Sequence, residues 1–407
     1  MNVFNDLKRM PREIWIQSLA ILINRAGTMV LPFLVIYLTK GLGFSARSAG
    51  FAITVYGIGS VAASPLAGRL SDRLGPMTVL TTSLITSGCL LLFFPFISSY
   101  GTILALTLAW AVASETFRPA SMANISDLVG PELRKPAVAL IRLAVNLGMS
   151  IGPAVGGVLV LISFPSIFWI DGLTSILAGI LLLVVWVKTR TPDRPHHHTT
   201  LVSQQSLSPA ENRSILQDTH LVVFCVGAFL LGAVFFQHEA AMPLFLVRDL
   251  KLAESTYGFM FTVNTLIIVF VELPLNSAMV NWSHRQSLMI GGILCALGFG
   301  SLAFVSGTLG VMATVVVWTF GEMIMFPAMV AYVADLAPAH RRGEYMGFYN
   351  MAFSLALMVA PWAGTELLDR AGATILWFTC LAVGLLAAAI FSMARSTHGV
   401  NSEGMKA

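Results

Sequence analysis

Twelve apolar runs of about 20 residues follow one another along the chain and constrain its fold more than any other feature. A helix of that length crosses about 30 Å of hydrocarbon, whereas the strands of a β-barrel give weaker alternating segments of about ten residues. Only 11% of the residues are charged, against about 25% in a soluble domain, so the sequence predicts an all-α membrane protein. The runs cover residues 14–38, 49–67, 77–97, 102–126, 137–162, 167–187, 219–246, 257–280, 287–305, 310–334, 345–368 and 373–393.

The lysines and arginines outside these runs are divided unevenly between the two sides of the predicted membrane. With a cytoplasmic N-terminus, sixteen lie in cytoplasmic segments and five in outer loops. Because Lys and Arg accumulate in cytoplasmic loops, we expect a multi-pass protein of a bacterial inner membrane with both termini in the cytoplasm. The net charge of +4 therefore reflects topology and gives no support for nucleic-acid binding.

Two features of the runs could suggest other classes of protein. The first run follows Lys8, Arg9 and Arg12 but contains Asn24-Arg25 and lacks a small-residue cleavage site, so we interpret it as a retained span and not a signal peptide. The four cysteines all fall inside predicted spans, where free, buried thiols are expected and neither a disulfide nor a metal site is predicted. They are Cys89, Cys225, Cys295 and Cys380.

A polar segment divides the runs into two sets of six. Residues 188–218 contain Pro192 and Pro195, many Ser, Thr and Gln, and three histidines at 196–198, which is typical of a flexible linker. The histidines could bind a metal, but no Cys or second His cluster is near, so we expect a solvated linker and no cofactor. The predicted units are an N-terminal six-helix bundle (1–187), a cytoplasmic linker (188–218), a C-terminal six-helix bundle (219–395) and a cytoplasmic tail (396–407).

The two sets of runs are copies of one unit. At an offset of 208 residues, ten identities occur within 38 ungapped positions, which indicates an internal duplication. The identical pairs are Pro119 and Pro327, Ala120 and Ala328, Ala123 and Ala331, Asp127 and Asp335, Leu128 and Leu336, Arg134 and Arg342, Ala144 and Ala352, Leu147 and Leu355, Pro153 and Pro361, and Gly156 and Gly364.

The loop after the second run reads Gly68-Arg-Leu-Ser-Asp72-Arg73-Leu-Gly75. Its glycines allow close helix approach, and Asp72 and Arg73 can pair with neighbouring helix ends. This loop resembles the signature loop of the major facilitator superfamily, although Pro76-Met77 replaces the usual basic pair after the final glycine. The resemblance implies two pseudo-symmetric six-helix bundles, with Asp72 and Arg73 forming a cytoplasmic latch that keeps the outward-facing state closed inside.

A second motif, in the fifth run, reads Gly148-x-x-x-Gly152-Pro153-x-x-Gly156-Gly157. Glycines at this spacing, with a proline that bends the helix, give a flat face on which a helix of the other half can pack. The motif resembles the fifth-helix motif of the drug:proton antiporter branch of the superfamily, which implies proton-coupled efflux.

An ionised side chain inside a predicted span costs about 2.5–3.5 kcal/mol and needs a partner or a wet cavity, and six of the charged residues in the spans matter most. Burial raises the pKa of a carboxyl group and a neighbouring arginine lowers it, so such a pair can exchange a proton near neutral pH. We therefore predict that Glu115 or Glu322 carries a coupling proton, with Arg118 on the same helical face tuning Glu115; the alternative is a purely structural pair. The six are Arg25, Glu115, Arg118, Glu239, Glu272 and Glu322.

The remaining embedded polar groups have several interpretations. Arg25 could hold an anionic group of a substrate, but we favour its pairing with Glu239 or Glu272 across the two halves. Gln237 and His238 could donate hydrogen bonds to a substrate, and Arg142 and Asn146 are assigned to a cytoplasmic charge cluster with Asp127. Asp171 and Glu366 are expected to be solvated near the outer surface. The predicted cavity lining is Met29, Phe33, Tyr56, Phe117, Phe235, Phe236, Met242, Met325 and Phe326.

These observations predict a secondary transporter, acting as a monomer, that exports hydrophobic or amphipathic small molecules in exchange for protons by alternating access. The alternative is a symporter or uniporter for a nutrient, sugar or metabolite. No Walker sequence and no metalloprotease or Ser/His motif is present, so we expect neither ATP hydrolysis nor another enzymatic activity.

Overall fold

The computed structural model describes residues 9–189, 215–279, 281–338 and 341–394, and every regular element in these ranges is helical, which confirms the all-α class. The predicted tail and most of the predicted linker, including the histidines at 196–198, lie outside the described residues. The first half contains α2 (Arg12–Ala26), α3 (Val30–Ile36), η1 (Tyr37–Gly41), α4 (Ala46–Leu74), α5 (Pro76–Phe93), η2 (Phe94–Phe96), α6 (Tyr100–Glu115), α7 (Phe117–Leu128), α8 (Pro131–Ile162) and α9 (Phe164–Thr189).

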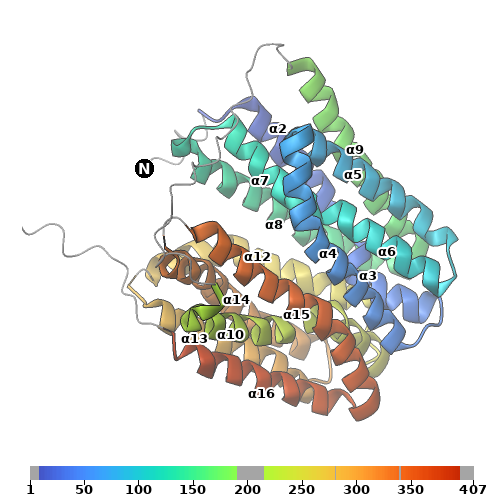
Figure 1. The fold of residues 1–407 in the computed structure, drawn as a ribbon. Coiled ribbons are helices and arrows are strands. Elements are labelled where there is room, and N and C mark those ends of the chain that lie inside the picture. The colour runs from blue at the N-terminus through green and yellow to red at the C-terminus, as the bar shows by residue number, and fades with distance from the viewer. Residues whose placement is uncertain (1–8, 190–214, 280, 339–340, 395–407) are drawn as a thin grey trace, which may run out of the picture.

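The second half forms a separate bundle below the first in Figure 1. It contains η4 (Ile215–Gln217), α10 (Thr219–Phe235), η5 (Phe236–Glu239), α11 (Ala241–Leu244), η6 (Phe245–Asp249), α12 (Glu254–Ala278), α13 (His284–Gly300), η7 (Ser301–Phe304), α14 (Thr308–Leu336), α15 (Arg342–Ala371) and α16 (Ala373–Phe391). We call the end of the molecule where α9 ends and α10 begins the linker end, and the opposite end the far end.

Ten helical segments of the described chain are long and apolar enough to cross a membrane, and α4, which bends, makes an eleventh. The remaining run is divided between α6, of 16 residues, and α7, of 12. Because the break at Thr116 leaves each piece too short to span alone, α6 and α7 together form the fourth span. The twelve predicted runs are thus all helical.

The first span is also broken, between α2 and α3, and a carboxylate of α9 seals the break. Asp171, Met29 and Val30 are all buried. The Oδ2 atom of Asp171 accepts hydrogen bonds from the backbone N–H groups of Met29, at 3.0 Å, and Val30, at 3.1 Å. Beside them, Asn24 donates to the hydroxyl of Ser175. The expectation that Asp171 is solvated is wrong, because it satisfies backbone groups freed by a broken helix inside the membrane.

Two helix pairs form the seams between the halves: α4 packs against α15, and α8 packs against α12. On the first seam, a Cβ at Gly57 would lie 2.8 Å from the Cα of Met358. On the second, a Cβ at Gly258 would lie 2.1 Å from the carbonyl oxygen of Pro153, and one at Gly157 would lie 2.8 Å from the Cα of Ser255. Only glycine permits backbones to approach this closely.

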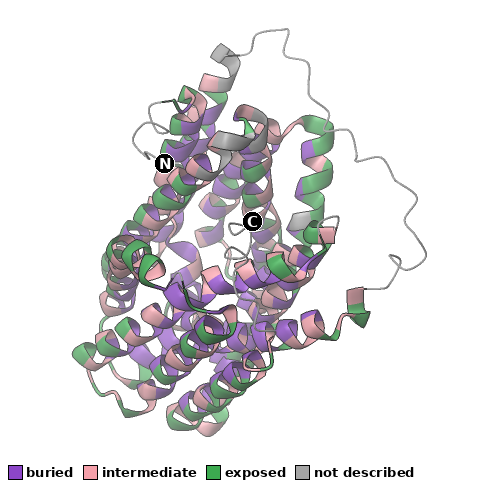
Figure 2. Ribbon diagram, turned by 90° about the vertical axis from the view of Figure 1, so that its left-hand side faces the viewer, coloured by how far each residue is buried: buried purple, intermediate pink, exposed green. Residues whose placement is uncertain are grey.

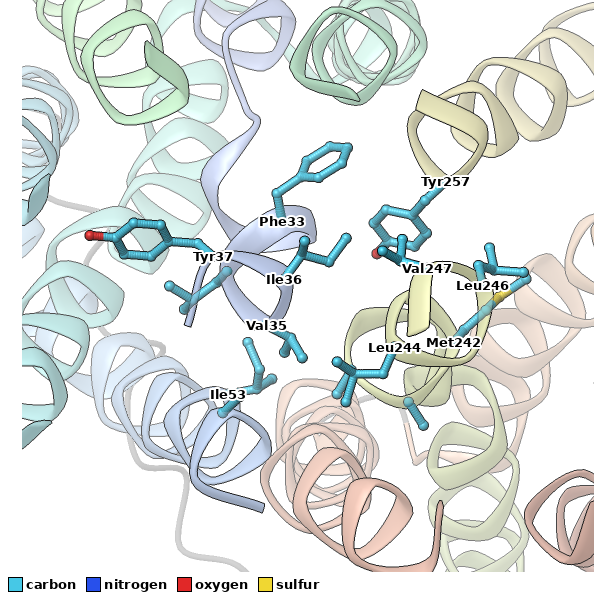
Figure 3. Close-up of a cluster of buried hydrophobic side chains, with 14 of the residues drawn as sticks. Phe33, Val35, Ile36, Tyr37, Ile53, Met242, Leu244, Leu246, Val247 and Tyr257 are labelled. Carbon is cyan, nitrogen blue, oxygen red and sulfur yellow. The ribbon is translucent and has the colours of Figure 1, made fainter. Parts of the chain in front are cut away.

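At the far end, apolar side chains from both halves form one buried cluster (Figure 3). Phe33 of α3 packs edge-on against Tyr257 of α12, with 5.3 Å between ring centroids. Two ion pairs join the halves beside this cluster: Lys40 with Glu254, and Arg47 with Glu366 at 3.4 Å. The molecule is therefore closed at its far end, and Phe33, which was predicted to line a cavity, belongs to the closure in this conformation.

Buried and exposed positions alternate along the same helices (Figure 2). Many exposed positions carry large apolar side chains, including Ile162, Leu273 and Leu309, of which more than three quarters of the surface is exposed. A soluble protein rarely presents so many, whereas a bilayer solvates them. The exposed surface therefore supports the membrane assignment.

Candidate functional site

The carboxylate of Glu115 ends α6 beside α4 in the first half. Its Oε1 accepts a hydrogen bond from the hydroxyl of Tyr56 at 2.8 Å, and the same hydroxyl lies 3.2 Å from that of Ser114. Glu115 and Arg118 form no ion pair in the described structure, although Thr116 between them keeps helical dihedral angles. The carboxylate is hydrogen-bonded to Tyr56 of α4 instead. Arg118 begins the next helix and is exposed.

Arg25, near the end of α2, lies over the ring of Phe117, with its Cζ 5.8 Å from the ring centroid. Its Nε is buried and has no hydrogen-bond partner in the described structure. Glu115 is the anionic group that attracts Arg25 most strongly, but no described carboxylate lies within the 4.0 Å of an ion pair. The favoured pairing of Arg25 with Glu239 or Glu272 is wrong, because each of these carboxylates has another partner.

In the second half, Glu322 of α14 faces α12. Its Oε2 accepts a hydrogen bond of 2.9 Å from the amide of Asn264, which also donates to the hydroxyl of Thr319 at 2.9 Å. Sequence reasoning missed Asn264, although the internal repeat pairs it with Tyr56, which lies 208 residues earlier. Tyr56 on α4 and Asn264 on α12 thus occupy equivalent positions of the repeat, and each donates a hydrogen bond to a carboxylate.

His238 and Glu239 form a pair where the seventh span breaks. Nε2 of His238 lies 3.1 Å from Oε1 of Glu239, and Nδ1 lies 2.6 Å from the carbonyl oxygen of Phe235. Since a carbonyl only accepts, Nδ1 is the donor, and the contact with Glu239 holds one proton, on either the imidazole or the carboxyl group. Both ring nitrogens are therefore engaged and neither is free for a substrate.

Gln237, the next candidate donor, fastens the seventh span to α15. Its amide nitrogen donates to the carbonyl oxygens of Ala233 and Ala360, both at 3.0 Å, which uses both amide hydrogens. Its side chain fills the space beside Gly364, where a Cβ would lie only 1.7 Å from Oε1. Gln237 is thus a helix-contact residue in this conformation and does not donate to the cavity as predicted.

Glu272 joins the two halves through an ion pair with Arg142, at 3.1 Å between Oε1 and Nη2. Arg142 lies on α8 and Glu272 on α12, so the pair continues the α8–α12 seam toward the linker end. Arg142 was assigned instead to a cluster with Asp127. The sequence alone could not reveal the contact, because it joins residues of different halves.

Comparison with known proteins identifies the family. The model of the Major Facilitator Superfamily matches residues 18–248 and 224–405, which together cover nearly the whole chain. The chain belongs to the major facilitator superfamily. It is therefore a transport protein and not an enzyme, and the resemblance noted in its loop and helix motifs is confirmed.

Three relatives of this superfamily protein are informative. A Na(+), Li(+), K(+)/H(+) antiporter of Planococcus maritimus is 23% identical, over 83% of this chain and 85% of the antiporter. Multidrug resistance protein 2 of Bacillus subtilis is 20% identical, over 84% of each chain. The solved structure of a D-xylose-proton symporter superposes with a TM-score of 0.75 over 94% of this chain and 99% of the symporter, at 15% identity, which supports the fold alone.

Residues 68–74 of the superfamily's signature sequence form the last turns of α4, so the predicted loop is helical there and only Gly75 lies between α4 and α5. Gly75 adopts φ +85° and ψ 144°, a region open essentially to glycine alone, and so makes the turn. Gly68, expected at a close helix contact, has open space where a Cβ would lie. Asp72 and Arg73 are exposed, and no described contact tests them, so their latch role stays a prediction.

The glycine motif of the fifth span packs differently from the prediction. A Cβ at Gly148 would lie 2.4 Å from that of Arg25, one at Gly152 would lie 2.7 Å from the carbonyl oxygen of Thr28, and one at Gly156 would meet Met29 at 3.1 Å. These three glycines therefore face the first span of the same half. Only Pro153 and Gly157 face the other half, because they lie on a neighbouring side of the helix.

No group of three or more His, Cys, Asp or Glu side chains in the described ranges could hold a metal ion.

Proposed function

We propose that this protein is a proton-coupled exporter of hydrophobic or amphipathic small molecules that works by alternating access. The observation that carries the proposal is the environment of Glu322. It is a membrane-embedded carboxylate held by one amide, that of Asn264, with no cation within ion-pair distance among the described residues. Because an uncompensated charge at this depth is costly, protonation and deprotonation of Glu322 would change the free energy of the two open states differently.

Glu115 suits a structural role better. A tyrosine hydroxyl fixes it, and its charge is offset by Arg25 nearby. We therefore assign the coupling proton to Glu322 and a charge-balancing role to Glu115.

Closure at the far end supports the alternating-access part of the proposal. The buried cluster around Phe33 and Tyr257 and the two inter-half ion pairs seal that end. The distribution of Lys and Arg assigns the linker end to the cytoplasm, so this conformation would be closed toward the outside of an inner membrane. The glycine-lined seams between α4 and α15 and between α8 and α12 are the surfaces on which the halves would rock.

The relatives support proton-coupled export without fixing the substrate. One is named as a cation/proton antiporter and another as a multidrug resistance protein. Of the predicted cavity lining, Phe235, Phe236 and Phe326 are partly exposed and would offer apolar surface to an amphipathic ligand, whereas Met242 and Met325 are packed in the core. Phe326, one turn from Glu322 on α14, forms edge-to-face contacts with Phe235 and Phe353.

The test uses purified protein in liposomes with a pH-sensitive dye inside and an imposed pH gradient. Substrate-driven proton movement in the antiport direction is expected for wild type and Glu115→Gln, and is expected to be lost in Glu322→Gln. Asp369→Asn, a partly exposed acid whose partner Arg248 lies in the same half, is the control and should retain coupling. Unchanged coupling in Glu322→Gln would overturn the assignment, and gradient-independent exchange of a labelled metabolite would favour a uniporter.

A further inference from the structure

The two halves differ in which of their embedded charged groups lack a partner. Of the embedded carboxylates in the second half, Glu239 and Glu272 have basic partners, His238 and Arg142, whereas Glu322 has only an amide. In the first half, Arg25 is the charged residue with a buried polar atom, its Nε, that has no hydrogen-bond partner among the described residues. One half therefore presents an unpaired acid and the other an unsatisfied base.

Arg25 needs an acceptor that the described protein does not provide. A guanidinium group has five N–H donors, and burying it without acceptors costs free energy. Its Nε is buried without a partner, and its flat face is covered by Phe117. Glu115, the nearby anion, is instead engaged by Tyr56. The edge of the guanidinium is thus left for an acceptor from elsewhere.

Arg25 and Glu322 flank the same part of the α8–α12 seam. The side chain of Arg25 begins against Gly148 of α8. Two residues along α8, the carbonyl oxygen of Ser150 accepts a hydrogen bond of 2.8 Å from Thr262 of α12. Two residues along α12, Asn264 holds Glu322. The α8–α12 seam thus lies between Arg25 of one half and Glu322 of the other.

We propose that the transported molecules are amphipathic zwitterions, which bind with an anionic group on Arg25 and an amine on Glu322. This inference rests on the proposed function and narrows its substrate class. Phe117 and Phe326 supply apolar surface beside the two poles. An ammonium group on Glu322 replaces the proton there, so binding of substrate and of the coupling proton exclude one another.

The experiment compares three ligands with the same aromatic body: 2-naphthylalanine, 2-(2-naphthyl)ethylamine and 3-(2-naphthyl)propionate. Dissociation constants are measured on the purified full chain in detergent by tryptophan fluorescence, without a proton gradient. We expect wild type to bind the zwitterion at least about tenfold more tightly than either analogue, the size of one charge-assisted hydrogen bond. Equal binding of zwitterion and amine by wild type would overturn the proposal.

Variants assign the two poles. Arg25→Gln should remove the preference for zwitterion over amine while leaving amine binding unchanged, and Arg25→Lys should restore part of it. Glu322→Gln should remove the preference for zwitterion over acid. Arg118→Gln is the control and should retain the wild-type pattern; loss of the preference there but not in Arg25→Gln would refute the assignment to Arg25.

Binding and coupling can fail separately. A retained zwitterion preference without proton movement in liposomes would reject the proposed antiport and keep the binding site. Proton-coupled transport of amines alone would keep the antiport and reject the zwitterion site. The unfolding temperature of each ligand-free variant shows whether it is folded.

Discussion

Tyr56 and Asn264 occupy equivalent positions of the internal repeat, and each donates a hydrogen bond to a carboxylate inside the membrane. Tyr56 also contacts Ser114, the residue that the repeat pairs with Glu322. The contact between α4 and α6 in one half therefore corresponds to that between α12 and α14 in the other. The two halves differ in the base near the carboxylate: Arg25 lies near Glu115, whereas the base that interacts with Glu322 is His238, which is already paired with Glu239.

Replacing Asn264 with leucine should slow proton-coupled transport about tenfold. The variant removes the amide that stabilises ionised Glu322, and a hydrogen bond to a charged group contributes about 1.5–3 kcal/mol. The rate of substrate-driven proton movement in liposomes measures the effect. Asn350→Leu, on the exposed face of α15, should keep the wild-type rate. An unimpaired rate in Asn264→Leu would remove Asn264 from the mechanism.

Asp171→Ala should destabilise the protein by about 1–3 kcal/mol, because two buried backbone N–H groups lose their acceptor. The measurement is the midpoint of thermal unfolding in detergent. Asp369→Ala, which removes a partly exposed ion pair with Arg248, should cost at most about 1 kcal/mol. Equal midpoints for the two variants would mean that Asp171 does not hold the broken first span together.

Gly258→Ala should impair transport, because its Cβ would lie 2.1 Å from the backbone of Pro153 and force α12 away from α8. The matched substitution is Gly347→Ala, a helical glycine of α15 with no atom near its Cβ position. That variant should transport normally and gain up to about 1 kcal/mol of stability from helix propensity. Normal transport by Gly258→Ala would show that the seam tolerates a wider separation.

Removing the far-end ion pairs should open that end more often. Glu254→Gln with Glu366→Gln deletes the acids that pair with Lys40 and Arg47. In a background without the four native cysteines, Met242→Cys within the buried cluster should then react several-fold faster with a membrane-impermeant maleimide. Glu344→Gln, whose pair with Arg341 is exposed at the linker end, is the control and should leave the reaction rate unchanged. Equal labelling rates with and without the two far-end acids would show that the apolar cluster alone holds the end closed.

The sequence by itself determined the helices and their number. Apolar runs of about 20 residues have one stable form in a bilayer, since a helix satisfies its own backbone hydrogen bonds, and this holds wherever neighbouring helices lie. The internal repeat also aligned Glu322 with Ser114, the residue next to Glu115, because a duplication can be detected from the sequence without coordinates.

Only the tertiary structure decided which charges meet. Periodicity predicted a pair between Glu115 and Arg118, but Glu115 is hydrogen-bonded to Tyr56 of another helix. Arg142 and Glu272 lie 130 residues apart on different halves, and Asp171 reaches a break in the first span from α9. Electrostatic partners depend on distances of a few ångströms between distant segments, and such distances are fixed by helix packing and not by spacing along the chain.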